Sequence, residues 1–366
     1  MNSNPPSPLK KAFTKGLLKW NAGENSRLMP WKGEKDPYRI WISEIILQQT
    51  RVEQGLGYYK RFIKTFPDIR QLAAAPDEKV FKCWEGLGYY SRCRNLLATA
   101  RFIARERDGR FPDSYETILS LKGIGPYTAA AISSFAFQLP HAVVDGNVYR
   151  VLSRYFGMDT PVDSTAGKKM FNRLAEELLD PKQPGLYNQA IMDFGAVVCR
   201  PAAPLCDSCV FRKKCIAFRD GLVSKLPVKA KKTRIRERWF SYTIPLYNNS
   251  LAVRRRTGKD IWQDLYEFPM IETKKKISPE KLVKAIAEKK WVDKKSVITC
   301  GKPLFFRQQL SHQLINGMFV ELHLQQRPAG EPDWQWIKKK QLEKFSFPGL
   351  INQYLAQGIA LPRDRR

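Results

Sequence analysis

Four cysteines lie close together in the stretch CRPAAPLCDSCVFRKKC, namely Cys199, Cys206, Cys209 and Cys215. Four thiolates within one short segment can bind a metal ion or an iron–sulfur cluster. A structural zinc site of four cysteines usually shows two C-x2-C pairs, and this stretch has one, so zinc is the less typical occupant. Three basic residues between the last two cysteines can present positive charge to a phosphate backbone: Arg212, Lys213 and Lys214.

The stretch LKGIGPYT, residues 121–128, predicts a tight turn that leads into a helix. Gly123 and Gly125 permit backbone angles that other residues resist, and Pro126 suits the first helical position. The free amides at such a helix start can bind an anionic oxygen. No strand precedes the turn, and neither the dinucleotide-binding motif nor the P-loop motif is complete. An ordinary connection between two helices is the alternative interpretation.

Two carboxyl groups are candidates for acid–base chemistry. Asp145 lies in the stretch HAVVDGNVYR, where a Gly-Asn turn is expected to expose it. Glu44 falls in a predicted helix, on one face with Trp41 and Leu47. An apolar, aromatic setting raises the pKa of a carboxyl, which can then act as an acid near neutrality. Taken singly, Asp145 is more often a turn residue and Glu44 more often a solvated helix residue.

The turn, Asp145 and the cysteines together resemble the helix-hairpin-helix DNA glycosylases of base excision repair. The cysteine spacing is similar to that of the [4Fe–4S] loop in the endonuclease III branch. Further stretches extend the resemblance to the MutY family of adenine glycosylases: LMPWKGEKDPYRIWISEIILQQTRV, WEGLGYYSRCRNLL, DIWQDLYEFP and QLSHQ. That family removes adenine misincorporated opposite 8-oxoguanine. The resemblance implies a [4Fe–4S] cluster on the four cysteines.

The resemblance also implies roles for single residues. Glu44 would protonate adenine at N7, and Asp145 would stabilise the oxocarbenium sugar. The amides around Gly123 and Gly125 would hold a DNA phosphate. Gln49 and Tyr89 would enter the duplex beside 8-oxoguanine. The remaining side chains implied to lie near the base or to steady Asp145 are Trp31, Gln48, Tyr127, Asn147 and Gln189.

Tyr127 decides between two kinds of glycosylase. Members of the endonuclease III type carry a lysine at this position, which forms a Schiff base and cleaves the strand. Without that amine the lyase route is lost, so we expect a monofunctional enzyme. A bifunctional glycosylase/lyase is the alternative, and a non-catalytic iron–sulfur protein that binds damaged DNA is a second one. Retention of both Glu44 and Asp145 argues against the second alternative.

Two positions depart from the family pattern. Lys32 stands where family members often carry arginine, and Leu310 replaces the phenylalanine of a Phe-Ser-His element. Ser311 and His312 are retained, so the resemblance implies 8-oxoguanine recognition through them. The C-terminal part is similar to a Nudix domain. It lacks the R-E-x-x-E-E-x-G metal signature, which argues against a nucleotide hydrolase.

The elements that must position these residues follow from hydrophobic periodicity. Residues 9–220 are predicted to be mostly helical, and the stretch 36–66 predicts helix with a break at its glycines, around residues 55–57. Beyond residue 236 the period shifts toward two, with two helical stretches at 278–291 and 350–357. We therefore expect two domains. These are an all-α helix-hairpin-helix domain over 1–221 and an α+β Nudix-like domain over 237–366, joined by a basic linker over 222–236.

Composition points to a polyanionic partner. The chain has 366 residues and a formal net charge of +28, which favours nucleic acid. No apolar run approaches the roughly 18 residues of a membrane span, and the N-terminus has no apolar signal segment. We expect a soluble, monomeric protein of the bacterial cytoplasm, associated with the nucleoid. Its expected partner is duplex DNA with A:8-oxoguanine or A:G mispairs.

Overall fold

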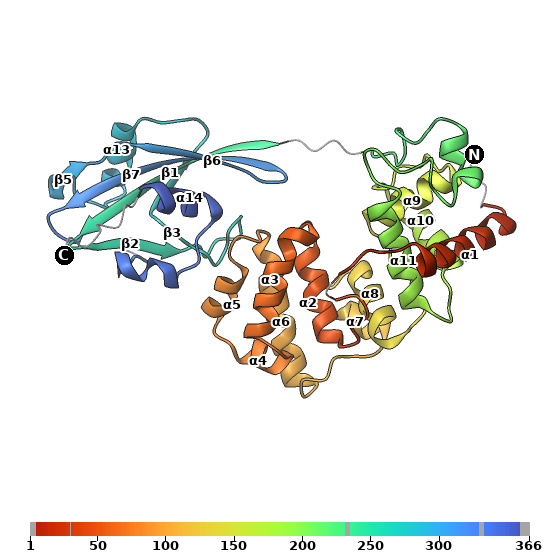
Figure 1. Cartoon of the computed structure of the whole chain (residues 1–366). Helices are drawn as coiled ribbons and strands as arrows, with labels where there is room; N and C mark the ends of the chain where they lie inside the picture. Colours follow the sequence, from red (N-terminus) through yellow and green to blue (C-terminus); the bar gives the residue numbers. More distant parts are fainter. Residues whose placement is uncertain (1–4, 30, 231–234, 329–332, 359–366) are drawn as a thin grey trace. The chain divides into compact units, whose positions relative to one another are not determined.

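The computed structural model describes residues 5–29, 31–230, 235–328 and 333–358. The chain divides into two compact units, the first Met1–Ala74 with Asn95–Lys232 and the second Ala75–Arg94 with Thr233–Arg366. The first unit is helical and the second contains the β-sheet (Figure 1). This confirms the predicted fold class. The predicted domain limits stay a prediction, and residues 231–234 of the expected linker lie outside the described residues.

Most helices belong to the first unit, and their bounds are as follows. They are α1 (Ser7–Gly23), α2 (Pro37–Leu47), α3 (Val52–Thr65), α4 (Ile69–Ala74), α7 (Tyr115–Ser120), α8 (Pro126–Phe137), α9 (Gly146–Phe156), α10 (Thr165–Leu178), α11 (Pro184–Val197), η1 (Arg212–Lys214) and α12 (Ile216–Arg219). Helix α5 (Asp77–Trp84) belongs to the second unit, and α6 (Tyr90–Glu106) begins in the second unit and ends in the first.

Side-chain caps define where the site-bearing helices begin. Asp36 accepts a hydrogen bond from the Tyr38 amide at 2.9 Å, and Pro37 occupies the first turn of α2. Asp145 caps α9 in the same way. Helix α9 ends at Gly157, whose φ of 65° is the left-handed conformation that favours glycine. The cap and the glycine together determine which residues α9 presents at its N-terminus.

The break in the stretch 36–66 differs from the prediction. Helix α2 ends at Leu47 and α3 begins at Val52, so both glycines lie inside a helix and the expected break at 55–57 is wrong. Gly55 is needed for close packing instead, because a Cβ there would lie 2.9 Å from the Leu47 Cδ2 atom. The chain turns at residues 48–51, which places Gln48 and Gln49 in the turn.

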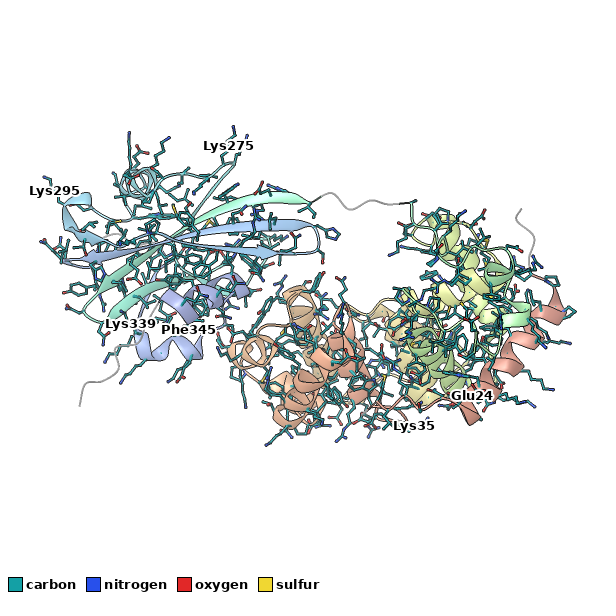
Figure 2. The ribbon with its side chains drawn as sticks, turned by 45° about the horizontal axis from the view of Figure 1, so that its top comes forward. Glu24, Lys35, Lys275, Lys295, Lys339 and Phe345 are labelled. Carbon is teal, nitrogen blue, oxygen red and sulfur yellow. The ribbon has the colours of Figure 1, made fainter. Side chains whose placement is uncertain are left out.

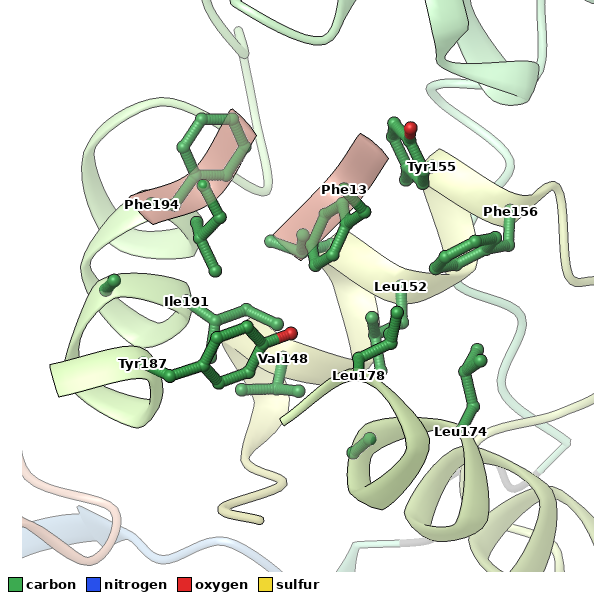
Figure 3. Close-up of a cluster of buried hydrophobic side chains, with 14 of the residues drawn as sticks. Phe13, Val148, Leu152, Tyr155, Phe156, Leu174, Leu178, Tyr187, Ile191 and Phe194 are labelled. Carbon is green, nitrogen blue, oxygen red and sulfur yellow. The ribbon is translucent and has the colours of Figure 1, made fainter. Parts of the chain in front are cut away.

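A buried aromatic and aliphatic cluster holds the helices of the first unit together. The side chains labelled in Figure 3 belong to this cluster and are Phe13, Val148, Leu152, Tyr155, Phe156, Leu174, Leu178, Tyr187, Ile191 and Phe194. They come from α1, α9, α10 and α11. Burying one such side chain fully stabilises a protein by about 1.5–3 kcal/mol. Helices α9 and α11 therefore form a rigid support for the polar residues at their other faces.

The second unit is built on a mixed sheet. Its strands are β1 (Arg236–Tyr247), β2 (Ser250–Arg255), β3 (Tyr266–Glu267), β4 (Met270–Thr273), β5 (Val297–Cys300), β6 (Leu304–Gln309), β7 (Gln313–Leu324) and β8 (Gln335–Lys338). The order β3-β2-β1-β7-β5 forms its main path, and β4, β6 and β8 pair with β1, β7 and β2 respectively. The long strands β1 and β7 are parallel, while the other pairs are antiparallel.

Helices lie on both faces of this sheet. Leu282 of α13 (Pro279–Glu288) belongs to one buried cluster with Met318 and Val320 of β7. Tyr354 of α14 (Gly349–Gly358) stacks on Phe319, with ring centroids 4.6 Å apart. Successive residues of a strand point to opposite faces, so α13 and α14 cover opposite sides of β7. The short elements η2 (Lys294–Ser296) and η3 (Lys339–Lys344) precede β5 and follow β8.

Basic side chains cover both units. Lys35 of the first unit is exposed, as are Lys275 and Lys295 of the second, and all three are labelled in Figure 2. A surface of this charge attracts polyanions over several ångströms of solvent. Within the described residues, no helix has the length and apolar character needed to cross a bilayer.

Candidate active site

The first unit contains a pocket of about 480 Å³ that gathers the predicted catalytic residues and several of the predicted base-binding ones. Its lining includes Arg27, Met29, Trp31, Glu44, Leu47, Gln48, Gln49, Arg51, Tyr127, Asp145, Asn147, Tyr149, Gln189 and Met192. Helices α2, α8, α9 and α11 each contribute to it. The volume lies within the range of small-molecule pockets. The structure thus brings together Glu44 and Asp145, whose meeting the sequence could not establish.

Glu44 is nearly fully buried, with 7% of its surface exposed. Burial raises the pKa of its carboxyl to about 7. A hydrogen bond with the Tyr127 hydroxyl acts in the opposite direction, and the nearby Asp145 raises the pKa further. Glu44 therefore carries a proton in an appreciable fraction of molecules at neutral pH, as a general acid requires.

Asp145 lies in a different environment within the same pocket. It is the N-cap of α9 and is half-buried, so the expected exposed turn is wrong. The Val148 amide donates to its Oδ1 atom at 2.8 Å, and the Asn147 Nδ2 atom donates to its Oδ2 atom at 2.7 Å. Burial raises the pKa of Asp145, and these hydrogen bonds oppose the rise. Their donors and the helix N-terminus favour the carboxylate form.

Tyr127 lines the same pocket as the two carboxyls. Burial, the two negative charges and the hydrogen bond to Glu44 all raise its pKa well above the usual value of a phenol. Its hydroxyl donates to the Met192 sulfur at 3.7 Å. Tyr127 therefore stays a neutral phenol beside Glu44. Lysine is absent from the lining of this pocket, as far as the described residues extend.

Arg150, which the sequence analysis missed, determines how Asn147 is oriented. Its guanidinium donates to the Asn147 Oδ1 atom at 2.7 Å and to the Cys199 carbonyl at 2.7 Å. An arginine can only donate, so the Asn147 amide nitrogen must face Asp145. The sequence could have revealed Arg150, because it is a basic residue on the apolar face of the amphipathic stretch 146–156.

The four cysteines line one small pocket in the first unit. The Arg154 guanidinium approaches the Cys199 sulfur at 3.6 Å, and the Phe211 amide approaches the Cys209 sulfur at 3.4 Å. Among the residues that the structure describes, no three His, Cys, Asp or Glu side chains are arranged to hold one metal ion. A cubane cluster places each thiolate on a different iron, so its four ligands need not converge on a point. The donor set fits a cluster better than a single zinc ion.

The predicted turn is present between α7 and α8. Gly123 has a φ of 81°, and a Cβ there would lie 2.5 Å from the Asn95 Cβ atom. Gly125 caps α8, and nothing lies within 4 Å of the Cβ position there. The start of α8 therefore presents amides on an open face. The three basic residues of η1, Arg212, Lys213 and Lys214, are also exposed.

Gln49 and Tyr89 share an unusual backbone conformation. Their φ angles are 59° and 48°, in the left-handed region that non-glycine residues seldom adopt. Such strain persists where the surrounding structure enforces it, often at functional sites. Tyr89 is 40% exposed, whereas the neighbouring Tyr90 is buried in the core. The two tyrosines thus have separate roles.

Ser311 and His312 lie between β6 and β7, in the second unit. Both are exposed and belong to the connecting turn instead of a strand. Within this unit, the Tyr89 hydroxyl forms a hydrogen bond with the Ser311 hydroxyl. The backbone of Leu310 closes the turn, its amide donating to the Gln313 carbonyl at 2.7 Å. Leu310 is half-buried, so the turn forms without the aromatic residue.

Sequence comparison finds two family models in the chain. The HhH-GPD superfamily of base excision DNA repair proteins matches residues 42–181, and a NUDIX domain matches residues 242–357. An adenine DNA glycosylase of Buchnera aphidicola subsp. Schizaphis graminum is 37% identical over 265 residues, covering 72% of this chain and 76% of that protein. The Mus musculus adenine DNA glycosylase is 41% identical over 228 residues, which are 59% of this chain and 44% of the mouse protein.

Comparison with solved structures gives the same fold for the helical part. A thermostable thymine-DNA glycosylase superposes with a TM-score of 0.54 at 30% identity, covering 58% of this chain and 98% of that chain. An endonuclease III in a non-covalent DNA complex superposes with a TM-score of 0.52 at 19% identity, over 60% and 99% of the two chains. The second likeness concerns the fold alone.

Proposed function

Because the chain belongs to the adenine DNA glycosylase family, we propose that it excises adenine mispaired with 8-oxoguanine or guanine in duplex DNA. Family membership makes it a DNA N-glycosylase, a hydrolase of base excision repair that acts on DNA. The observation that carries the finer proposal is the meeting of Glu44 and Asp145 in one pocket, in unlike environments. Two carboxyls with separate roles are what hydrolysis of a glycosidic bond requires.

Glu44 is the general acid of the proposed reaction. Adenine leaves poorly as an anion, and protonation at N7 turns it into a neutral leaving group. The buried Glu44 carboxyl, with its pKa of about 7, gives this proton. The bond between C1′ and N9 breaks, and its electron pair stays on the base. General acid catalysis of this kind contributes about 10²–10⁴-fold in rate.

Asp145 stabilises the positive charge that develops on the sugar. Its carboxylate is held by Val148 and Asn147, so it needs no rearrangement as the charge appears. Water then adds to C1′, and the proton it loses returns to Glu44. Tyr127 offers a phenol where a lyase needs an amine, which supports a monofunctional enzyme over the bifunctional alternative.

DNA binding in this proposal uses the open start of α8 and the exposed basic residues of η1. The helix amides and Gly123–Gly125 hold one phosphate, and Arg212, Lys213 and Lys214 neutralise others. The base must leave the stack before it can enter the pocket. Gln49, beside Gln48 at the pocket, and Tyr89 enter the duplex beside 8-oxoguanine. Their left-handed backbone conformations support a functional role.

The remaining parts of the proposal concern the opposite base and the cofactor. Ser311 and His312 recognise 8-oxoguanine from the turn between β6 and β7. Four thiolates, those of Cys199, Cys206, Cys209 and Cys215, hold a [4Fe–4S] cluster, which supplies a structural clamp for the loop that carries η1. Trp31, which is buried and packs edge-on against Tyr59 at 5.4 Å, forms the pocket wall with Gln189.

The test is a single-turnover assay on a labelled duplex with one A:8-oxoguanine pair, analysed with and without hot alkali. We expect cleavage of the adenine strand only after alkali, and a loss of about 10²-fold or more in Glu44→Gln. Cleavage without alkali would reveal a lyase and contradict our interpretation of Tyr127. Binding without base release under either treatment would support the non-catalytic alternative.

A further inference from the structure

Asp193 is a fully buried carboxylate beside the pocket, and four side chains donate to it. On its Oδ1 atom, Arg27 Nη1 lies at 2.9 Å and Gln189 Nε2 at 2.8 Å. On its Oδ2 atom, Asn25 Nδ2 lies at 2.9 Å and Lys32 Nζ at 3.1 Å. The exposed fraction of the Asp193 side chain is 0%. A carboxylate has about four acceptor positions, so these donors saturate it.

The donors come from two parts of the first unit. Asn25, Arg27 and Lys32 belong to the segment between α1 and α2, while Gln189 lies one turn before Asp193 on α11. A cost of several kcal/mol is typical for burying a charge, and it is offset only by good partners. Asp193 is the one charged residue of α11, in an otherwise apolar and neutral sequence. This isolation is the signal by which the sequence could have revealed it.

The contact with Asp193 determines which end of the Gln189 amide faces the pocket. A carboxylate in ion pairs with Arg27 and Lys32 can only accept hydrogen bonds. The oxygen and nitrogen of a glutamine amide are assigned from their hydrogen-bond partners, so the Gln189 NH2 group must point at Asp193. The Oε1 atom is left for the pocket. Gln189 lines both the main pocket and an adjoining one of about 230 Å³, together with Trp31 and Glu44.

We propose that Asp193 is a positioning residue that sets base selectivity by presenting Gln189 as a hydrogen-bond acceptor. The inference rests on the proposed function, adenine excision in this pocket. Adenine carries an amino group at C6, which donates to the Gln189 Oε1 atom. Hypoxanthine carries an oxygen at C6, which meets that atom with repulsion. Purine, with only hydrogen at C6, has neither interaction.

A purely structural role for Asp193 would have different consequences. If the ion pairs of Asp193 with Arg27 and Lys32 only held their segment against α11, the loss of Asp193 would slow excision of all three bases alike. If it orients Gln189, its loss frees the amide to rotate and changes the ratio between the bases. Intrinsic differences among the three leaving groups cancel when that ratio is compared between variants.

The experiment measures single-turnover rates of Asp193→Ala on duplexes with adenine, purine or hypoxanthine opposite 8-oxoguanine. Alanine removes both oxygens that accept from Gln189 and its neighbours, and Arg27 and Lys32 are 22% and 31% exposed, so both can turn to water. We expect the ratio of adenine to hypoxanthine rates to fall at least about tenfold, equivalent to about 1.4 kcal/mol. The control Asn25→Ala removes another donor of the same carboxylate and should leave the ratio unchanged.

A double-mutant cycle separates the two roles. In a Gln189→Leu background, Asp193→Ala should change the ratio no further, because the amide that Asp193 orients is gone. An unchanged ratio in Asp193→Ala, or an equal effect in both backgrounds, would overturn the inference. If Asp193→Ala melts below the assay temperature, Gln189→Leu alone decides, since a wild-type ratio in it would also overturn the inference. A wild-type protein that releases no adenine would instead refute the proposed function.

Discussion

Glu44 and Asp145 show how one pocket gives two carboxyls different properties. Asp145 receives a backbone amide and an asparagine NH2 group at a helix N-terminus, which partly offset the rise that burial causes in its pKa. Glu44, in the last turn of α2, has the Tyr127 hydroxyl as its offsetting partner, and its pKa rises to about 7. Unlike environments that separate two pKa values are the usual way in which an enzyme assigns acid and base roles.

A pH profile tests this assignment at the residue level. The protonated form of Glu44 is the active one, so the single-turnover rate should fall as the pH rises above about 7, and it should fall again at acidic pH, where the Asp145 carboxylate takes up a proton. The Tyr127 hydroxyl lowers the pKa of Glu44 by stabilising the carboxylate. Tyr127→Phe should therefore raise that pKa and move the inflection to higher pH. An inflection that stays in place or moves to lower pH would show that another group controls the profile.

At the level of elements, the two glycines of the turn between α7 and α8 have different purposes, one in folding and the other in DNA binding. Gly123 needs its positive φ and lies against Asn95, whereas Gly125 has an ordinary φ of −98° and open space around it. The first glycine is therefore required by the fold. The second is the one at which an added methyl group would stand between the α8 amides and a phosphate.

Replacing each glycine by alanine should give different results. Gly123→Ala should destabilise the protein by about 2 kcal/mol or more, seen as a lower melting temperature. Gly125→Ala should melt like the wild type but bind an uncleavable mispaired duplex several-fold more weakly. Unchanged DNA binding in Gly125→Ala would mean that α8 does not hold a phosphate.

The cysteine loop and the N-terminus of α9 are connected through few residues. Arg150 reaches from the Asn147 side chain to the Cys199 carbonyl, so the cysteine loop and the support of Asp145 share one guanidinium. Gly195 permits this closeness, because a Cβ there would lie 2.6 Å from the Asn147 Cβ atom. The position of the Asp145 carboxylate thus depends on α9, α11 and the cysteine loop together.

For the whole molecule, the main features are its net positive charge and the location of the two candidate sites in different units. A net charge of +28 distributed over both units suits a protein that contacts a long polyanion. The candidate catalytic pocket lies in the helical unit, while the candidate reader of the opposite base lies in the unit with the sheet. Excision and recognition of the opposite base should therefore be separable by mutation.

Ser311→Ala combined with His312→Ala tests this separation. Each lost hydrogen bond is worth about 1 kcal/mol, so the pair should reduce affinity for A:8-oxoguanine duplexes about tenfold or more. Affinity for A:G duplexes, measured under the same salt conditions, should change little. Equal losses on both duplexes would assign the turn a general role in DNA binding instead of 8-oxoguanine recognition.

Local sequence was sufficient for several features of this protein. The glycines and proline of the turn, the apolar periodicity of the helices and the change to period two near residue 236 all predicted the observed elements. These features obey rules that act over a few residues, such as allowed φ angles, capping and alternation of side chains. The cysteine spacing and the resemblance to adenine glycosylases also came from the sequence alone.

Tertiary structure decided what depends on distant contacts. It placed the break within the stretch 36–66 at residues 48–51, and it left Gly55 inside α3, where a Cβ would lie 2.9 Å from the Leu47 Cδ2 atom. It raised the pKa of Glu44 through burial and gave Asp193 its four donors. No local spacing determines such properties, because burial and hydrogen-bond partners arise only when segments far apart in the chain pack together.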